Sequence, residues 1–363
     1  MPETKTKSKV YFIPVDNSTK LEESVLRLGT LLKKSGLLDL IGPGDKAAVK
    51  LHFGEQGNTG YVRPEYLRVI CDQIKDKKAS AFLADTNTLY RGQRTNSPDH
   101  LKLAYAHGFT PEKTGVEVII PDDTRKEQTQ DVVINRKFIK TAKIARIFWD
   151  ADVIVGVAHF KGHIMTGFGG ALKNLGMGCA TREGKLAQHS NVALFVIENN
   201  CVGCAACQKV CPAAAISVRN KKAGVDIAKC IGCASCIAAC KHNAMEINWE
   251  AGGRDIQQKM IEYTSAALKN KKDKAVFINF CLKITQECDC WGMDNPVIAS
   301  DLGILISRDP VSVDKACFDL INAAAGKDIF KETHPNRDGL IQLRYAQELG
   351  IGSLDYDLIS VTS

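Results

Sequence analysis

The sequence lacks any long apolar segment. Its 363 residues contain no run of 18 or more apolar residues, so it predicts no membrane span. The N-terminal stretch MPETKTKSK is polar and has none of the apolar core that a secretion signal carries. These absences lead us to expect a cytoplasmic protein that does not use a membrane as a partner.

The sequence also lacks a dense basic patch. Its formal net charge is +7, but lysines and arginines are scattered, apart from a short run at residues 269–274. Proteins that bind nucleic acids usually gather their basic residues on one face or in one segment. The charge pattern therefore predicts no nucleic-acid partner.

Cysteine is abundant, with 14 residues in the chain. A reducing compartment makes a disulfide framework unexpected and makes metal or redox chemistry the default. Eight of the cysteines form two runs of the pattern C-x2-C-x2-C-x3-C, at residues 201–211 and 230–240, with a period of 29 residues. Neither run contains a histidine, which favours iron–sulfur clusters over zinc knuckles.

These runs resemble bacterial two-cluster ferredoxins, in which the fourth cysteine of each run ligates the other cluster. The resemblance covers about residues 196–247, with Pro212 after the first run and Lys241 where a second proline often stands. The first predicted [4Fe-4S] cluster has as ligands Cys201, Cys204, Cys207 and Cys240. The second has Cys230, Cys233, Cys236 and Cys211.

Outside these runs, strand-like and helical segments alternate. Expected strands lie at 10–15, 47–53, 153–160 and 275–280, and expected helices at 21–36, 64–77, 255–269 and 312–325. This alternation predicts an α/β fold, with a mostly parallel sheet covered by helices on both faces. Such elements occur on both sides of the cysteine runs. We therefore expect a discontinuous α/β domain (1–195 plus 248–363) and an inserted ferredoxin-like domain (196–247).

Polar residues follow several expected strands. They are His52, Asp85, Thr86, Asn87, His159, Lys161 and His163. Because the carboxyl ends of parallel strands share one edge of a sheet, we expect these side chains to form a common site. His159 and His163, with Lys161, are the candidate catalytic residues, since an imidazole exchanges protons near neutral pH. Taken singly, each residue also fits a surface or capping role.

A glycine-rich stretch, GFGGALKN, includes Gly167, Gly169 and Gly170 before an expected helix that carries Lys173. Backbone N–H groups at such a helix start bind anions. The stretch matches neither the Walker pattern nor the Rossmann fingerprint, so it does not predict a nucleotide. We expect a small anionic substrate held by this turn with Lys161, Lys173 and Arg94. The alternative is a tight turn that only packs.

Three further cysteines, Cys281, Cys288 and Cys290, lie within CLKITQECDCW. They predict a third metal site, either an iron–sulfur cluster or zinc, in a loop that brings the thiolates together. Cys179 is one candidate for the fourth ligand. Free or redox-active thiols are the alternative. The two remaining cysteines, Cys71 and Cys317, lie in apolar helical stretches and are expected in the core.

The segment HFKGHIMTGFGGALKNLGMGCA, the two cysteine runs and C-x6-C-D-C together resemble a known family. It is the ferredoxin-bearing branch of the family catalogued as "domain of unknown function 362". The resemblance covers essentially the whole chain. It implies an iron–sulfur protein most at home in anaerobic metabolism, and it supplies no catalytic residues.

These observations predict an iron–sulfur oxidoreductase. Two [4Fe-4S] clusters would pass low-potential electrons from a redox partner protein, a ferredoxin or a reductase, to a site in the α/β domain. One alternative is an electron carrier or docking subunit of a larger redox complex without its own substrate. Another is a carrier of a labile metal or cluster.

Overall fold

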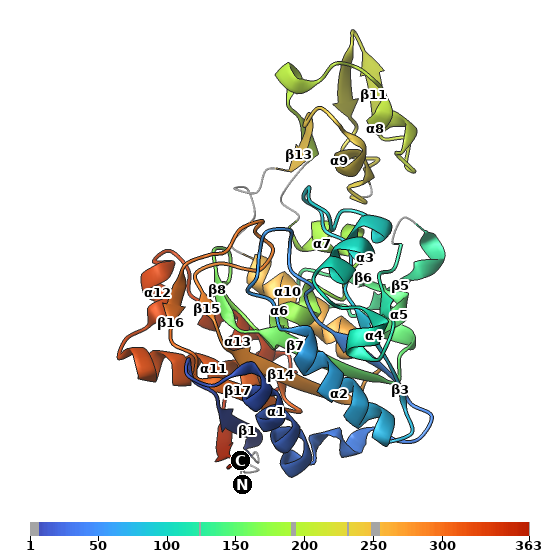
Figure 1. Cartoon of the computed structure of the whole chain (residues 1–363). Helices are drawn as coiled ribbons and strands as arrows, with labels where there is room; N and C mark the ends of the chain where they lie inside the picture. Colours follow the sequence, from blue (N-terminus) through green and yellow to red (C-terminus); the bar gives the residue numbers. More distant parts are fainter. Residues whose placement is uncertain (1–6, 123–124, 190–193, 231, 248–254, 363) are drawn as a thin grey trace.

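The computed structural model describes residues 7–122, 125–189, 194–230, 232–247 and 255–362. Its centre is an eight-stranded sheet (Figure 1). In spatial order the strands are β18 (Tyr356–Ser360), β1 (Ser8–Pro14), β17 (Gly303–Ser307), β14 (Ala275–Cys281), β7 (Val153–His159), β2 (Lys46–Lys50), β3 (Ser80–Ala84) and β4 (Val118–Ile119).

This sheet is mostly parallel, which confirms the prediction. Strands β14, β7, β2, β3 and β4 pair in parallel, as do β1 and β18, whereas β17 is antiparallel to both of its neighbours. The exception has a local cause. A loop with a small hairpin, β15 (Ile284–Thr285) and β16 (Val297–Ala299), joins β14 to β17. If β17 were parallel to β14, the chain would first have to cross back to the end of the sheet where β14 begins.

Helices cover both faces of the sheet. The alternating side chains of β14 show this: Val276 and Ile278 share one core cluster with α1 (Leu21–Ser35) and α2 (Pro64–Asp76). Phe277 belongs to a second cluster on the opposite face. The helices of that second face are α6 (Ala171–Gly176), α10 (Ile256–Leu268), α11 (Pro310–Ala325) and α13 (Leu340–Glu348).

Local signals set the ends of the main helices. The side chain of Asp309 accepts hydrogen bonds from the N–H groups of Val311 (2.8 Å) and Ser312 (3.0 Å) and so begins α11. Its first residue, Pro310, lacks the N–H that would have no partner there. Gly36, with φ of 63°, ends α1 in the left-handed conformation that glycine adopts without strain.

Shorter helices and strands lie between these main elements along the chain. They are η1 (Leu37–Leu40), α3 (Ser97–Ala106), α4 (Pro111–Thr114), η2 (Lys126–Gln128), β5 (Thr129–Val133), β6 (Thr141–Ala145), α5 (Arg146–Asp150), β8 (Lys161–His163), β9 (Gly167–Gly169), α7 (Arg182–Gln188) and α12 (Ile329–Thr333). The hairpins β5–β6 and β8–β9 were not expected from the sequence. Within the described ranges, no helix combines the length and apolar character needed to cross a bilayer.

Residues 194–247 form what we call the small unit, which stands outside the large sheet at the top of Figure 1. Its elements are β10 (Leu194–Val196), η3 (Glu198–Asn200), α8 (Ala206–Lys209), β11 (Ile216–Arg219), β12 (Lys222–Val225), α9 (Ser235–Ala239) and β13 (Met245–Ile247). It has its own apolar core, which includes Ile216, Ile237 and Met245. Leu89 and Leu186 of the remaining chain pack into this core.

An aromatic group supports the loops on the second face of the sheet. Phe168 of β9 is fully buried, and its ring lies 5.1 Å from that of Phe160, 5.4 Å from Phe318 and 5.8 Å from Phe330, measured between centroids. The β8–β9 hairpin is therefore anchored by packing as well as by backbone pairing.

We predict that Phe168→Ala lowers the free energy of unfolding by about 3–5 kcal/mol, because it leaves a cavity among three other rings. Urea denaturation measures this loss. Leu26→Ala is the control: this side chain is 72% exposed, so its removal should change stability by no more than about 0.5 kcal/mol. Equal, small effects of both substitutions would contradict the packing described above.

Candidate functional site

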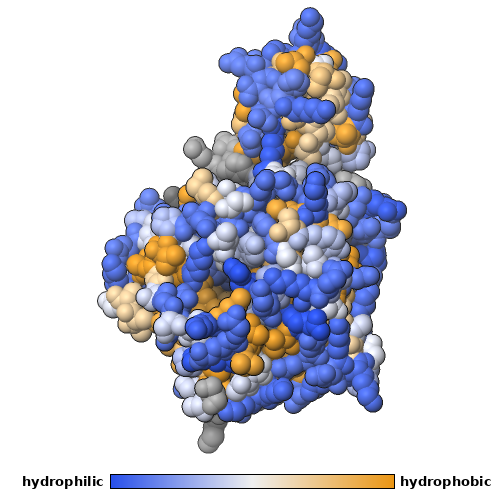
Figure 2. Space-filling model, viewed as in Figure 1, coloured by the Kyte–Doolittle hydropathy of each residue, from blue (hydrophilic) through white to orange (hydrophobic). Residues whose placement is uncertain are grey.

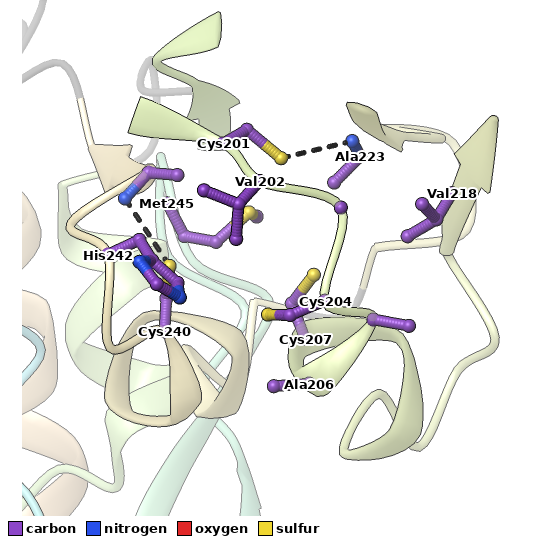
Figure 3. A pocket seen from close by; sticks show the side chains of 13 residues that line it. Cys201, Val202, Cys204, Ala206, Cys207, Val218, Ala223, Cys240, His242 and Met245 are labelled. Atoms are coloured by element: carbon purple, nitrogen blue, oxygen red, sulfur yellow. Dashed lines mark hydrogen bonds between the residues drawn. The ribbon is translucent and has the colours of Figure 1, made fainter. Parts of the chain in front are cut away.

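The small unit contains two cavities lined by cysteines. One, with about 320 Å³ of open space, is shown in Figure 3, and its cysteines are Cys201, Cys204, Cys207 and Cys240. The other has about 300 Å³ of space that is open to solvent, and its cysteines are Cys211, Cys230, Cys233 and Cys236. Each cavity thus draws three cysteines from one sequence run and one from the other, in the same two sets that the resemblance to two-cluster ferredoxins implies.

The two cysteine loops have the same backbone conformation. Gly203 and Gly232 have φ of 70° and 75°, and Ala205 and Ala234 have φ of 58° and 56°. Alanine rarely adopts this left-handed conformation, so its occurrence at matching positions shows that the 29-residue repeat extends to the fold. Small residues at these positions keep the backbone close to each cavity.

Backbone N–H groups point at the cysteine sulfurs. The N–H of Ala244 donates to Sγ of Cys240, and that of Ala215 to Sγ of Cys211, each at 3.3 Å. A third such bond, from Ala223 to Cys201, is drawn in Figure 3. Burial raises the pKa of Cys240, but backbone N–H groups and the nearby Arg91 outweigh it and lower this pKa overall. These donors suit sulfurs that carry negative charge.

A buried carboxylate, Asp289, organises the site at the carboxyl ends of the large sheet. Its two oxygens lie 2.9 Å from Nδ1 of His159, the last residue of β7, and 2.8 Å from Nζ of Lys161. Burial alone would raise the pKa of Asp289, but these two side chains hold it well below its usual range. Gly60 permits the close approach, because a Cβ there would lie 2.8 Å from Oδ1 of Asp289.

The cysteines on either side of Asp289 meet in a turn. The N–H of Trp291 donates to the carbonyl of Cys288 at 3.1 Å and closes this turn. Nζ of Lys173 lies 3.4 Å from Sγ of Cys288, and Cys290 is near enough for a hydrogen bond between the two thiols to affect both pKa values. The hydrogen bond and this ammonium hold the pKa of Cys288 well below its usual range despite burial, whereas the pKa of Cys290 is raised.

Cys281 does not join this pair. It is the last residue of β14, and its side chain contacts that of Cys317 on α11. The alternation of β14 explains this, because Cys281 shares a face with Phe277 and so belongs to the core cluster that includes α11. The predicted three-cysteine metal site is therefore divided between two places. Within the described ranges, no three His, Cys, Asp or Glu side chains converge on one point that could hold a single metal ion, and this includes the side chains around Cys288.

Two other cysteines are core residues. Cys71 on α2 and Cys179 after α6 are both fully buried. Burial raises the pKa of each to about 12, so both remain neutral thiols. The possible fourth ligand Cys179 thus lies in the core cluster that includes α6 and α10.

A second charged cluster surrounds Arg94. Its Nε lies 3.2 Å from Glu55, and its Nη1 lies 2.8 Å from Nε2 of His52 and 3.6 Å from Asp85. Lys50 at the end of β2 pairs with Asp85 at 3.0 Å. The residues that follow β2 and β3 thus meet around one buried guanidinium, whose pKa its anionic neighbours raise despite burial.

The two clusters are neighbours. Asp289 and Lys161 both influence the pKa of His52, which burial and Arg94 lower well below its usual range. The hydroxyl of Tyr90 accepts a hydrogen bond from Arg94, and Cys290 lies close enough to contribute to the raised pKa of this buried tyrosine. The polar residues predicted at several strand ends thus lie within one connected region.

His163 and the residues after Asp85 have structural partners. Nδ1 of His163 accepts hydrogen bonds from the N–H groups of Met165 and Thr166, both at 3.2 Å. Burial and the nearby Lys173 lower its pKa well below the usual range, so the ring stays neutral. Thr86 and Asn87 donate to the carbonyls of residues 178 and 121, and so fix loops in place.

The glycine-rich turn binds an internal anion. The N–H groups of Ala171 and Leu172 donate to the carboxylate of Asp314, at 2.7 and 3.0 Å. A Cβ at Gly170 would lie 2.3 Å from the same carboxylate. Gly167 and Gly169 belong to the β8–β9 hairpin. The predicted use of this turn for an anionic ligand does not fit this arrangement, because its N–H groups are already bonded.

Comparison with known proteins places the chain in a family. The family described as "Domain of unknown function (DUF362)" matches residues 47–319, and the chain belongs to it. No curated protein matches the chain.

Two solved structures share a distant likeness of fold. One is the lactate racemase apoprotein from Thermoanaerobacterium thermosaccharolyticum, at 15% identity and a TM-score of 0.39, with 78% of this chain and 52% of that chain covered. The other is a protein from Thermotoga maritima, at 12% identity and a TM-score of 0.43, with 85% and 60% covered. The present chain thus spans about half of the length of the racemase.

We predict that Arg94→Ala lowers the free energy of unfolding by about 3–5 kcal/mol, because it leaves Glu55 and Asp85 buried without their guanidinium. Arg94→Lys should recover only part of this loss, since an ammonium lacks the planar fork. The control is Arg68→Ala, which removes an exposed ion pair with Asp72 and should cost at most about 1 kcal/mol. Equal stabilities of the two alanine variants in urea denaturation would refute the role of Arg94.

Proposed function

We propose that this protein transfers electrons through two [4Fe-4S] clusters held by the small unit. On this proposal, residues 196–247 are an inserted ferredoxin-like domain, and the chain belongs to a ferredoxin-bearing branch of its family. Electrons would pass to the site around Asp289 in the part of the chain that forms the eight-stranded sheet, which we call the large unit. This transfer would make the protein an iron–sulfur oxidoreductase. The clusters would supply single electrons at low potential.

One observation carries the proposal: the two cavities are lined by cysteines in crossed sets. A [4Fe-4S] cluster bonds its four thiolates at four different iron atoms, so its ligands surround a space. The N–H···S bonds to Cys201, Cys211 and Cys240 also support the proposal, because hydrogen bonds to sulfur stabilise bound clusters and tune their reduction potentials.

The first cavity offers a point of entry for electrons. Cys204 is exposed, and the side chain of Val202, which lines the same cavity, is 54% exposed. Val210 and Ile227 are also exposed apolar side chains of the small unit, on which Figure 2 shows apolar areas. A partly apolar surface beside a redox centre suits brief contact with a ferredoxin or a reductase.

In the large unit, the residues proposed to act on a substrate are His159 and Lys161. Both ring nitrogens of His159 face oxygen acceptors: Asp289, and the carbonyl of Lys283 at 3.1 Å from Nε2. These two contacts hold the ring at the end of β7, where His159 would exchange a proton with a substrate. The neutral His163 is the less suitable proton donor, because its Nδ1 already accepts two N–H groups.

The cations expected to bind an anionic substrate all have internal partners. Arg94 pairs with Glu55, Lys161 with Asp289, and Lys173 contacts Cys288. This observation favours a second candidate function, an electron carrier or docking subunit without its own substrate. A small anion that raises the melting temperature of the wild type, but not of a Lys161→Met variant, would favour the oxidoreductase instead.

We predict about eight irons and eight acid-labile sulfides per chain in protein purified without oxygen. The crossed sets make a sharper prediction for double variants. Cys211→Ser with Cys233→Ser removes two ligands of one cluster, so about four irons should remain. Cys211→Ser with Cys204→Ser removes one ligand from each cluster, so both should be lost.

The control is Cys71→Ser, which changes a core thiol on α2 and should keep about eight irons. If each run instead held its own cluster, the iron contents of the two double variants would be reversed. Wild-type protein with neither iron nor sulfide, still after chemical reconstitution, would end the proposal.

A further inference from the structure

The electron-transfer proposal leaves the Cys288–Cys290 pair without a role. Both cysteines lie in the turn closed by the N–H of Trp291, and each affects the pKa of the other. Cys288 is only 3% exposed, while Cys290 is partly exposed. Two cysteines on either side of one residue in a closed turn, one of them 3.4 Å from an ammonium, are the parts of a dithiol that can close to a disulfide.

The surroundings hold this pair in place. Asp289 between the cysteines is anchored by His159 and Lys161, and the carbonyl of Asp289 accepts the N–H of Glu55 at 2.9 Å. The backbone of the turn is therefore held from two sides, so the two cysteines stay neighbours while the bonding of their sulfurs changes. Such a support lets a redox pair react without rearrangement of the fold.

We propose that Cys288 and Cys290 form a reversible dithiol–disulfide couple that stores two electrons beside the site in the large unit. On reduction, the S–S bond breaks and accepts two electrons and one proton. Cys288 becomes a thiolate that faces the ammonium of Lys173, and Cys290 takes the proton as a thiol. Oxidation returns both electrons and this proton to a two-electron acceptor and remakes the S–S bond.

The couple deepens the proposed function and rests on it for its electron source. Two clusters that each transfer one electron can together supply the two electrons that reduce one disulfide. The chain also offers a short connection between them: Arg91 lies 3.5 Å from the carbonyl of Met245, which lines the first cavity. The adjacent Tyr90 lies within electrostatic range of Cys290. Residues 90 and 91 thus bridge the cysteine cavity and the dithiol.

The experiment uses the full-length protein, purified without oxygen and equilibrated in glutathione buffers of graded potential. After acid quenching and alkylation in denaturant, trypsin releases the peptide Ile284–Arg308, in which Cys288 and Cys290 are the only cysteines. We expect this peptide to escape alkylation in oxidising buffers and to be lighter than the reduced peptide by two hydrogen atoms. Reduction by dithionite should restore two alkylated cysteines.

Variants separate the couple from other thiol chemistry. Cys290→Ser should abolish the disulfide, and its iron content should equal that of the wild type. Cys71→Ala, a core thiol elsewhere, should leave the transition of the peptide unchanged. In a reductive titration, the oxidised wild type should take up about two electrons more per chain than Cys290→Ser.

Lys173 provides a test of mechanism. Lys173→Met removes the ammonium that stabilises the reduced form, so we expect the equilibrium constant for reduction to fall about tenfold, which shifts the potential by about 30 mV to more negative values. Lys33→Met removes the same charge from α1, on the opposite face of the sheet, and should not shift the potential.

Two outcomes would overturn the couple. One is alkylation of both cysteines in every buffer, and the other is loss of iron or zinc from Cys288→Ser, which would make the pair metal ligands. These results are separate from the fate of the electron-transfer proposal. Protein with about eight irons but no disulfide rejects only the couple. Protein with the disulfide but without iron keeps the couple and rejects the clusters as its electron source.

Discussion

The bond of Asp289 to His159 and Lys161 is the interaction on which the rest of the site depends. It ties the loop after β14 to the end of β7, and Asp289 is fully buried there, where a charge needs its partner. The turn that carries Cys288 and Cys290 is fixed by this carboxylate between them. The backbone hydrogen bonds from Trp291 to Cys288 and from Glu55 to Asp289 hold the same turn from its other side.

The strand ends show what the sequence could predict. Alternating strands and helices implied parallel strands, and parallel strands bring His52, Asp85 and His159 to one edge of the sheet. The residues that contact these side chains could not be predicted in this way. Arg94 and Glu55 lie in irregular loops, and Asp289 is 130 residues from His159 in the chain. Hydrophobic periodicity carries no information about contacts between loops.

The sequence predicted the grouping of the cysteines in the two runs, but it did not predict the surroundings of Cys281. In the two runs, the repeated pattern C-x2-C-x2-C-x3-C resembles two-cluster ferredoxins, and this resemblance implied the crossed sets of cysteines that line the cavities. Around Cys281, closeness in sequence to Cys288 and Cys290 did not mean closeness in space. Strand alternation places Cys281 on the face of Phe277, toward α11, and the chain then leaves the strand before Cys288. The glycine-rich turn failed similarly, because its anion is Asp314, more than a hundred residues away.

Charge balance explains why the thiol pair suits electron storage. Arg94 and Lys50 share Glu55 and Asp85, and Asp289 is shared by His159 and Lys161. Lys173 has Cys288 as its partner, and a sulfur can balance an ammonium only as a thiolate. Closing a disulfide would remove that negative charge and leave Lys173 facing a neutral sulfur. The buried site is therefore better balanced when the pair is reduced, so its own electrostatics draw electrons toward Cys288 and Cys290.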